Sequence, residues 1–274
     1  MESQADQISY SVVRIETDVG TGTGFLYNFG GVQGLNETIT LVTNKHVIAN
    51  SKCGKLQFCS SPNKVEPCDT VHQDLIFENS FCQHWIPHPD AEVDLTFMYL
   101  GSYLAIWANE KRWIYCKCIA NNIIINDDRA KTLSVAEDVI MVGYPNGLAD
   151  DFNNKPIFRS GITSTKYVNN YNGKQDFLVD IACFPGSSGS PVFLKELGMR
   201  EGRIAGFYTF LGIVYKNWSY SENGVLEKVE IPSGYEIISK TFIPLNLAIV
   251  MKATRLLELD EVMRSRYKGN DSTE

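Results

Sequence analysis

Short apolar segments recur along most of the chain, and they are bounded by Gly, Asn, Asp or Pro. Segments of this length that are rich in Val, Ile, Phe, Thr and Tyr are typical of strands in a β-barrel or sandwich. The pattern predicts strands at 10–16, 23–28, 38–43, 56–59, 75–78, 94–99 and 114–119, and then at 138–142, 157–164, 177–181, 191–194, 204–210 and 242–244. The segment 101–112 predicts a connector with a helical turn, which divides these strands into two comparable sets.

One helix is predicted near the C-terminal end of the sequence. Leu245, Ala248, Ile249 and Leu256 recur at roughly helical spacing between 244 and about 263. Pro244 suits the first turn of a helix, because its missing N–H is not needed there. The sequence therefore predicts a mostly β protein that ends in an α-helix at about 245–263.

Composition and charge exclude several classes of protein. With 274 residues, 44% hydrophobic and 21% charged, the chain is neither disordered nor of low complexity. A formal net charge of −7 disfavours nucleic acid as a partner, because a negative field repels phosphates. No apolar run is long enough for a membrane span, and the polar first residues do not resemble a secretory signal.

The cysteines favour a reducing compartment. There are seven of them, an odd number that cannot pair completely within one chain. We therefore expect a cytoplasmic protein. The cysteine spacing contains no C-x-x-C pair, so we expect neither a metal site nor a cofactor.

The segment 184–191 is the most informative for chemistry. It places Ser187 and Ser188 between Gly186 and Gly189, in a tight turn between two predicted strands. A serine held there can attack a carbonyl group while the N–H groups of Gly186 and Ser188 stabilise the oxyanion. The same residues also fit an ordinary Gly/Ser hairpin loop, so the interpretation depends on a suitable base and acid elsewhere.

The four histidines, at 46, 72, 84 and 88, all precede this turn. Their position excludes the α/β-hydrolase order of serine, acid and histidine, and leaves the orders His-Asp-Ser and Asp-His-Ser. The second order would need Asp6 or Asp18 and a helix-rich parallel sheet, which the strand pattern contradicts. His46 ends an apolar strand, although a lone histidine there is more often a core residue. Asp94 opens a buried-looking strand, where a carboxylate needs a partner.

These motifs together resemble the chymotrypsin/trypsin-like serine peptidases, especially the bacterial branch with the glutamyl endopeptidases and the catalytic domains of heat-shock PDZ proteases. The resemblance extends over most of the chain. The similar segments are 22–26 in the first barrel, 42–47 around the base, 94–97 around the acid, 143–147 in the second barrel and 185–191 around the nucleophile. Any one of these segments is a moderate signal, whereas their order along the chain is a strong one.

The resemblance implies an all-β fold of two six-stranded Greek-key barrels with a C-terminal helix. The first barrel, residues 1–112, would carry His46 as general base and Asp94 as its orienting acid. The second, residues 113–274, would carry Ser188 as nucleophile, chosen over Ser187 and Ser190 by the glycine that follows it. The N–H groups of Gly186 and Ser188 would form the oxyanion hole.

The resemblance also implies a substrate pocket lined by residues before the nucleophile and by a later strand, here Ala182, Cys183, Gly206, Phe207 and Tyr208. The expected function is a serine endopeptidase acting on proteins or peptides, with narrow specificity or with activity controlled by an activating or inhibitory protein partner. A trypsin-like binding module with a silent triad is the alternative. Neither nucleic acid nor membrane is expected as a partner.

Overall fold

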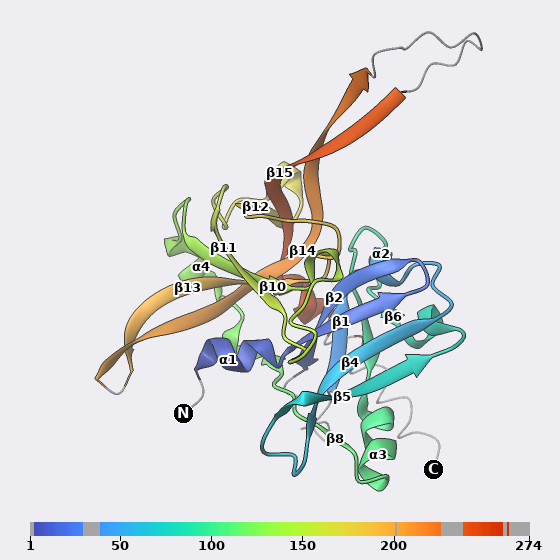
Figure 1. Ribbon diagram of the computed structural model, residues 1–274. Helices are drawn as coiled ribbons and strands as arrows, with labels where there is room; N and C mark the ends of the chain where they lie inside the picture. Colours follow the sequence, from blue (N-terminus) through green and yellow to red (C-terminus); the bar gives the residue numbers. More distant parts are fainter. Residues whose placement is uncertain (1–2, 30–38, 201, 226–237, 260–261, 263–274) are drawn as a thin grey trace, which may run out of the picture.

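The computed structural model describes residues 3–29, 39–200, 202–225, 238–259 and 262. These residues form two β-sheets, and short helices lie at their edges (Figure 1). The predicted all-β class with a short C-terminal helix is confirmed. The first sheet runs from blue to green in Figure 1, and the second runs from yellow-green to red-brown.

The first sheet has nine strands, whereas six were predicted for the first barrel. They are β1 Val12–Thr17, β2 Gly20–Asn28, β3 Ile39–Thr43, β4 Gly54–Ser61, β5 Cys68–Phe77, β6 Ile86–Pro87, β7 Thr96–Tyr99, β8 Trp113–Ile114 and β9 Ile119–Ala120. Their order is β5-β4-β1-β2-β3-β7-β6, while β8 pairs with β4 and β9 pairs with β2. Because β8 and β9 belong to this sheet, it extends beyond the predicted domain boundary at residue 112.

The second sheet closes into a barrel of six strands in the order β10-β11-β12-β15-β14-β13. The strands are β10 Asp138–Gly143, β11 Ile157–Thr163, β12 Asp176–Asp180, β13 Pro191–Arg200, β14 Arg203–Val225 and β15 Ile238–Lys252. All neighbouring strands in it are antiparallel. The β13–β14 and β14–β15 hairpins project from the barrel as long ribbons (Figure 1).

The helices of the described part are short, and all except the first and the last lie in connections between strands. The α-helices are α1 Gln4–Ser9, α2 Lys45–Ile48, α3 Gly101–Asn109 and α4 Asp127–Thr132. The 3₁₀ turns are η1 Phe81–His84, η2 Asn121–Ile123, η3 Pro145–Gly147, η4 Tyr171–Gly173 and η5 Ala253–Leu256. Helix α3 occupies the predicted connector between the two sets of strands.

The start of the predicted C-terminal helix is wrong. Residues 245–252 belong to strand β15, and helical geometry begins only at Ala253 and continues through residue 259. Ala248, Ile249, Val250 and Met251 are all buried, because β15 lies inside the closed barrel between β12 and β14. A continuous apolar run of this kind carries no period of two, so it is easily mistaken for a helix.

A buried cluster between the two sheets fixes their relative position. Phe25 and Phe97 from the first sheet pack in it with Phe193 and Phe210 from the second. The ring centroids of Phe25 and Phe210 are 5.6 Å apart in an edge-to-face arrangement. Each fully buried aromatic side chain contributes roughly 1.5–3 kcal/mol relative to an exposed one. The two sheets therefore form one packed unit, and a site between them can be held rigidly.

Candidate active site

His46 is held at the end of a buried strand. β3 ends at Thr43, and the single-turn helix α2 carries His46 in its second position. Asn44, between the two elements, is fully buried, and its side-chain amide donates a hydrogen bond to the backbone oxygen of Asp94 at 2.8 Å. This bond ties the start of α2 to the segment before β7. The His46 side chain is 49% exposed, so it is not a core histidine.

The carboxylate of Asp94 holds His46 with both of its oxygens. His46 Nδ1 lies 2.5 Å from Asp94 Oδ2, and the backbone N–H of His46 donates to Asp94 Oδ1 at 3.1 Å. A carboxylate can only accept at neutral pH, so Nδ1 carries the proton in this contact. The other ring nitrogen, Nε2, is then the basic one in the neutral imidazole, as a general base requires.

The turn that contains Ser188 is hydrogen-bonded to the first sheet. The Thr23 N–H donates to the backbone oxygen of Ser188 at 2.9 Å, and Thr23 Oγ1 donates to the oxygen of Gly186, also at 2.9 Å. Thr43 Oγ1 in turn donates to the oxygen of Thr23 at 2.7 Å. A Cβ atom at Gly189, whose φ is +87°, would lie only 1.8 Å from that same Thr23 oxygen. The Ser188 turn is therefore held against β2, and the neighbouring strand β3 ends next to His46.

Burial distinguishes the three serines of the turn. Ser187 and Ser190 are fully buried, and Ser187 Oγ accepts a hydrogen bond from the N–H of Phe184 at 3.3 Å. Ser188 is only half-buried, and its hydroxyl has no hydrogen-bond partner in the part of the chain that the structure describes. The structure thus brings His46 and Asp94 into direct contact, and it leaves the Ser188 hydroxyl available.

A second contact orients the peptide bond before Gly186. The N–H of Asn146, in turn η3, donates to the backbone oxygen of Pro185 at 2.5 Å. In a trans peptide the N–H points away from the carbonyl, so the Gly186 N–H faces the opposite side from Asn146. Within the described residues, the N–H groups of Gly186 and Ser188 donate to no acceptor. Two unpaired donors beside a serine suit a developing oxyanion.

The structure places the predicted pocket residues in two different regions. Ala182 and Cys183 lie directly before the turn, and burial raises the pKa of the Cys183 thiol. The side chain of Arg159 lies against this segment, with its guanidinium carbon 5.0 Å from the centroid of the Phe184 ring. Arg159 Nε is buried without a hydrogen-bond partner among the described residues.

Gly206, Phe207 and Tyr208 lie away from the Ser188 turn. They pair with Leu197, Glu196 and Lys195 toward the tip of the β13–β14 hairpin. The part of β14 next to the turn is Val214, which exchanges backbone hydrogen bonds with Gly189 and Ser190 at 2.8 and 3.0 Å. The prediction that Gly206, Phe207 and Tyr208 line the pocket is therefore corrected. The part of β14 beside the Ser188 turn lies beyond residue 210.

The remaining histidines have structural partners. His72 Nε2 lies 3.2 Å from the backbone oxygen of Asp69, and His84 Nδ1 lies 2.9 Å from the hydroxyl of Tyr103. His88 is buried, and its Nε2 lies 3.4 Å from a carboxylate oxygen of Glu258. Within the described residues, His, Cys, Asp and Glu form no group of three that could hold a metal ion. The seven cysteines are all free thiols.

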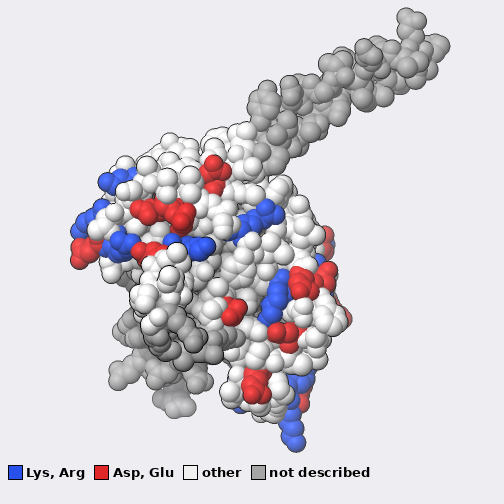
Figure 2. Space-filling model, turned by 60° about the vertical axis from the view of Figure 1, so that its left-hand side comes forward, with Lys and Arg blue, Asp and Glu red and all other residues white. Residues whose placement is uncertain are grey.

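Charged side chains of both signs are interspersed on the face of the molecule shown in Figure 2. The net charge of −7 is therefore not gathered into one acidic patch on this face. None of the helices that the structure describes has both the length and the apolar character to cross a membrane.

Several supporting residues were not assigned a role from the sequence. Thr23, Thr43 and Asn146 position the turn and the base through contacts between segments that are distant along the chain. Of these, Asn146 carried a local signal, because Pro-Asn-Gly is a typical turn sequence.

Comparison with known proteins gives a family match. No curated protein sequence matches the chain. Among solved structures, the chain is similar to a mutant of Rv3671c from M. tuberculosis H37Rv in an inactive form, with 14% identity, a TM-score of 0.44, and coverage of 91% of this chain and 84% of that chain.

It is also similar to the HtrA-type protease AlgW with a tripeptide, with 15% identity and a TM-score of 0.48. That match covers 95% of this chain and 61% of the AlgW chain. The profile of the trypsin-like peptidase domain matches residues 22–199, which include His46, Asp94 and Ser188. Because this match extends over more than half of the sequence, the chain belongs to the trypsin-like peptidase family.

Proposed function

We propose that the protein is a serine endopeptidase that hydrolyses peptide bonds with Ser188, His46 and Asp94. The observation that carries the proposal is the double hydrogen bond between His46 and the Asp94 carboxylate, at 2.5 and 3.1 Å. It fixes a half-exposed imidazole at the end of β3, and the Ser188 turn is hydrogen-bonded to the neighbouring strand β2. A serine becomes nucleophilic when such a base takes its proton.

The proposed reaction uses these three side chains in turn. As Ser188 Oγ bonds to the carbonyl carbon of the substrate, its proton passes to His46 Nε2, and the N–H groups of Gly186 and Ser188 stabilise the negative oxygen. The C–N bond then breaks, and His46 returns the proton to the leaving amine. Water attacks the resulting ester, gives one proton to His46, and releases the carboxylic acid. His46 finally returns that proton to Ser188 Oγ.

The proposal includes restraint of this activity by narrow specificity or by a protein partner. The half-buried state of Ser188 and the absence of a bond from its hydroxyl to another described residue support a site that is completed by its substrate. The same absence favours the second candidate, a trypsin-like module that binds peptides without cleaving them. The two candidates differ in whether a bound peptide is hydrolysed.

Hydrolysis of a peptide library, followed by mass spectrometry, tests the proposal. The wild type is compared with Ser188→Ala and with Ser160→Ala, which removes an exposed serine on β11 as a matched control. We expect cleavage by the wild type and Ser160→Ala, and none by Ser188→Ala. If peptides bind to the wild type and stay intact, the binding module is the correct interpretation.

A further inference from the structure

The loop between β10 and β11 connects the Ser188 turn to the first sheet. At its beginning, the N–H of Asn146 holds the carbonyl of Pro185, as described above. At its end, Lys155 reaches across to the first sheet, where Asp69 lies on β5. A single loop therefore contacts both the oxyanion donors and the neighbouring sheet.

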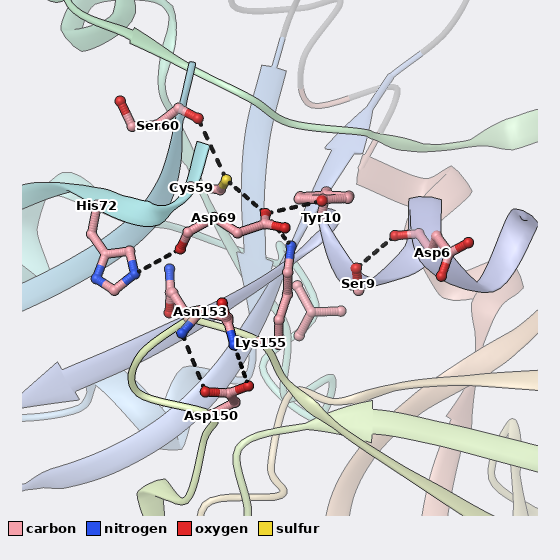
Figure 3. Close-up of polar contacts among 12 residues, drawn as sticks. Asp6, Ser9, Tyr10, Cys59, Ser60, Asp69, His72, Asp150, Asn153 and Lys155 are labelled. Atoms are coloured by element: carbon pink, nitrogen blue, oxygen red, sulfur yellow. Dashed lines mark hydrogen bonds and ion pairs between the residues drawn. The ribbon is translucent and has the colours of Figure 1, made fainter. Parts of the chain in front are cut away.

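Asp69 is the centre of a polar cluster at this contact (Figure 3). One of its oxygens, Oδ1, receives the Lys155 ammonium at 2.8 Å, the Tyr10 hydroxyl at 2.9 Å and the Cys59 thiol at 3.6 Å. The Lys155 nitrogen also lies 3.3 Å from the centroid of the Tyr10 ring. The Lys155 side chain is 22% exposed, so the ion pair is partly shielded from water.

The Asp69 carboxylate is charged at neutral pH. Burial acts to raise its pKa, but hydrogen bonds from Lys155 and Tyr10 outweigh burial and lower the pKa below the ordinary value. A charge-assisted hydrogen bond in a partly buried place is stronger than an exposed ion pair. The cluster therefore fixes the end of the loop to the first sheet.

Two hydrogen-bonded turns make up most of the loop between Asn146 and Lys155. Backbone bonds in both directions join Asp150 and Lys155, at 3.1 and 3.2 Å. The Asp150 carboxylate also accepts from the Asn153 side chain at 2.7 Å, as Figure 3 shows. Further along, the N–H of Leu148 donates to the oxygen of Pro145 at 2.8 Å. The loop thus consists of two hydrogen-bonded turns with only residue 149 between them. A displacement of Lys155 can therefore be passed on to Asn146.

We propose that Asp69 and Lys155 are positioning residues for the oxyanion hole. By fixing the loop, they hold Asn146 against Pro185, and this contact keeps the Gly186 N–H turned toward the substrate oxygen. The expected effect of these two residues on the rate of hydrolysis rests on the proposed function. The effect on the Asn146 hydrogen bond is independent of catalysis.

The same loop provides a matched control. Arg14 on β1 donates to Asp151 at 2.9 Å, but the Asp151 side chain is 81% exposed. Exposed ion pairs contribute little, because water and salt screen them. Asp151→Asn removes a charge from the turn that contains Lys155 without changing any residue of the Asp69 cluster.

The first test measures amide hydrogen exchange of Asn146 by NMR in the wild type, Asp69→Asn, Lys155→Met and Asp151→Asn. We expect exchange at Asn146 to accelerate by about tenfold or more in the first two variants and to stay within twofold in Asp151→Asn. A melting temperature for each variant separates this local opening from loss of the fold. Unchanged exchange in both cluster variants overturns the inference, whether or not the protein is an enzyme.

The second test measures kcat and KM on a cleaved peptide. We expect Asp69→Asn and Lys155→Met each to lower kcat by about tenfold with KM within twofold, because the lost interaction acts in the transition state. The double variant loses no more than either single one, since both changes break one contact. Lys155→Arg, which keeps the charge, retains most of kcat. Equal losses in kcat for Asp151→Asn, or additive losses in the double variant, contradict the inference.

The two proposals fail in distinguishable ways. No hydrolysis by the wild type, together with accelerated Asn146 exchange in the cluster variants, contradicts the proposed function alone. Hydrolysis by the wild type with unchanged exchange and unchanged kcat in the cluster variants contradicts the positioning role alone.

Discussion

Replacing Gly186 by alanine tests the oxyanion hole with a single methyl group. Gly186 has φ +87°, and a Cβ atom there would lie 2.7 Å from the oxygen of Tyr144 and 2.9 Å from the nitrogen of Asn146. Both neighbours are backbone atoms, so the loop must move by several tenths of an ångström. That movement separates the Asn146 N–H from the Pro185 oxygen and releases the peptide that carries the Gly186 N–H.

The substitution should lower both the stability of the protein and its kcat. Alanine in the left-handed region costs about 1–2 kcal/mol of stability. Loss of one oxyanion donor lowers kcat by about 10²–10³, which corresponds to roughly 2.7–4 kcal/mol in the activation free energy. Gly173→Ala separates the effects, because Gly173 has φ +77° and no atom within 4 Å of the added Cβ.

The assay combines thermal unfolding with kcat and KM on a cleaved peptide. We expect both variants to melt a few degrees below the wild type, about 2–4 °C per kcal/mol for a chain of this size. Only Gly186→Ala loses kcat, while Gly173→Ala stays within twofold of the wild type. If Gly186→Ala keeps the wild-type kcat, the oxyanion hole does not include the N–H of Gly186.

Three further changes probe other parts of the account. In Asp94→Asn, the amide cannot accept both bonds from His46, so we expect kcat to fall by about 10⁴ with little change in KM; a loss below tenfold in steady-state kinetics contradicts the role of Asp94. Burial lowers the pKa of His88 below its ordinary value of 6.5, so the unfolded chain binds a proton first as pH falls. The free energy of unfolding should therefore decrease below pH 6.5, by about 1.4 kcal/mol for each unit of difference between the folded and unfolded pKa. Denaturation at several pH values should show a weaker pH dependence of this free energy in His88→Asn than in the wild type. The same pH dependence in both proteins argues against this linkage. Arg159→Met removes a guanidinium whose buried Nε has no partner among the described residues. We expect the free energy of unfolding, measured by urea denaturation, to rise by about 1 kcal/mol, and a decrease would contradict this expectation.

The sequence predicted the elements whose signals are local. Ser188 lies in a turn between two glycines, and His46 directly follows an apolar strand, so both positions can be identified without knowledge of distant contacts. The observed strands β3, β12 and β13 flank these two positions, and the family match includes both of them. The sequence favoured Ser188 over Ser187 and Ser190 only through the glycine that follows it. The burial of Ser187 beside Phe184 and of Ser190 beside Gly143 depends on the folded structure.

Other features depend on long-range packing. Ala248 to Met251 were predicted as helix because an apolar run without alternation does not reveal that it is a strand buried on both faces. Tyr208 was assigned to the pocket because the length of β14 cannot be inferred from its apolar residues alone. The contact between Lys155 and Asp69 joins segments far apart in the chain, and nothing local marks either residue as its partner.

Reaction with a fluorophosphonate tests whether Ser188 is a nucleophile activated by His46. The labelled protein is digested and the adduct is located by mass spectrometry. We expect one covalent adduct on Ser188 in the wild type, and its loss in both Ser188→Ala and a folded His46→Ala variant. An adduct on Ser187 or Ser190, or a folded wild-type protein that remains unlabelled, would contradict the claim.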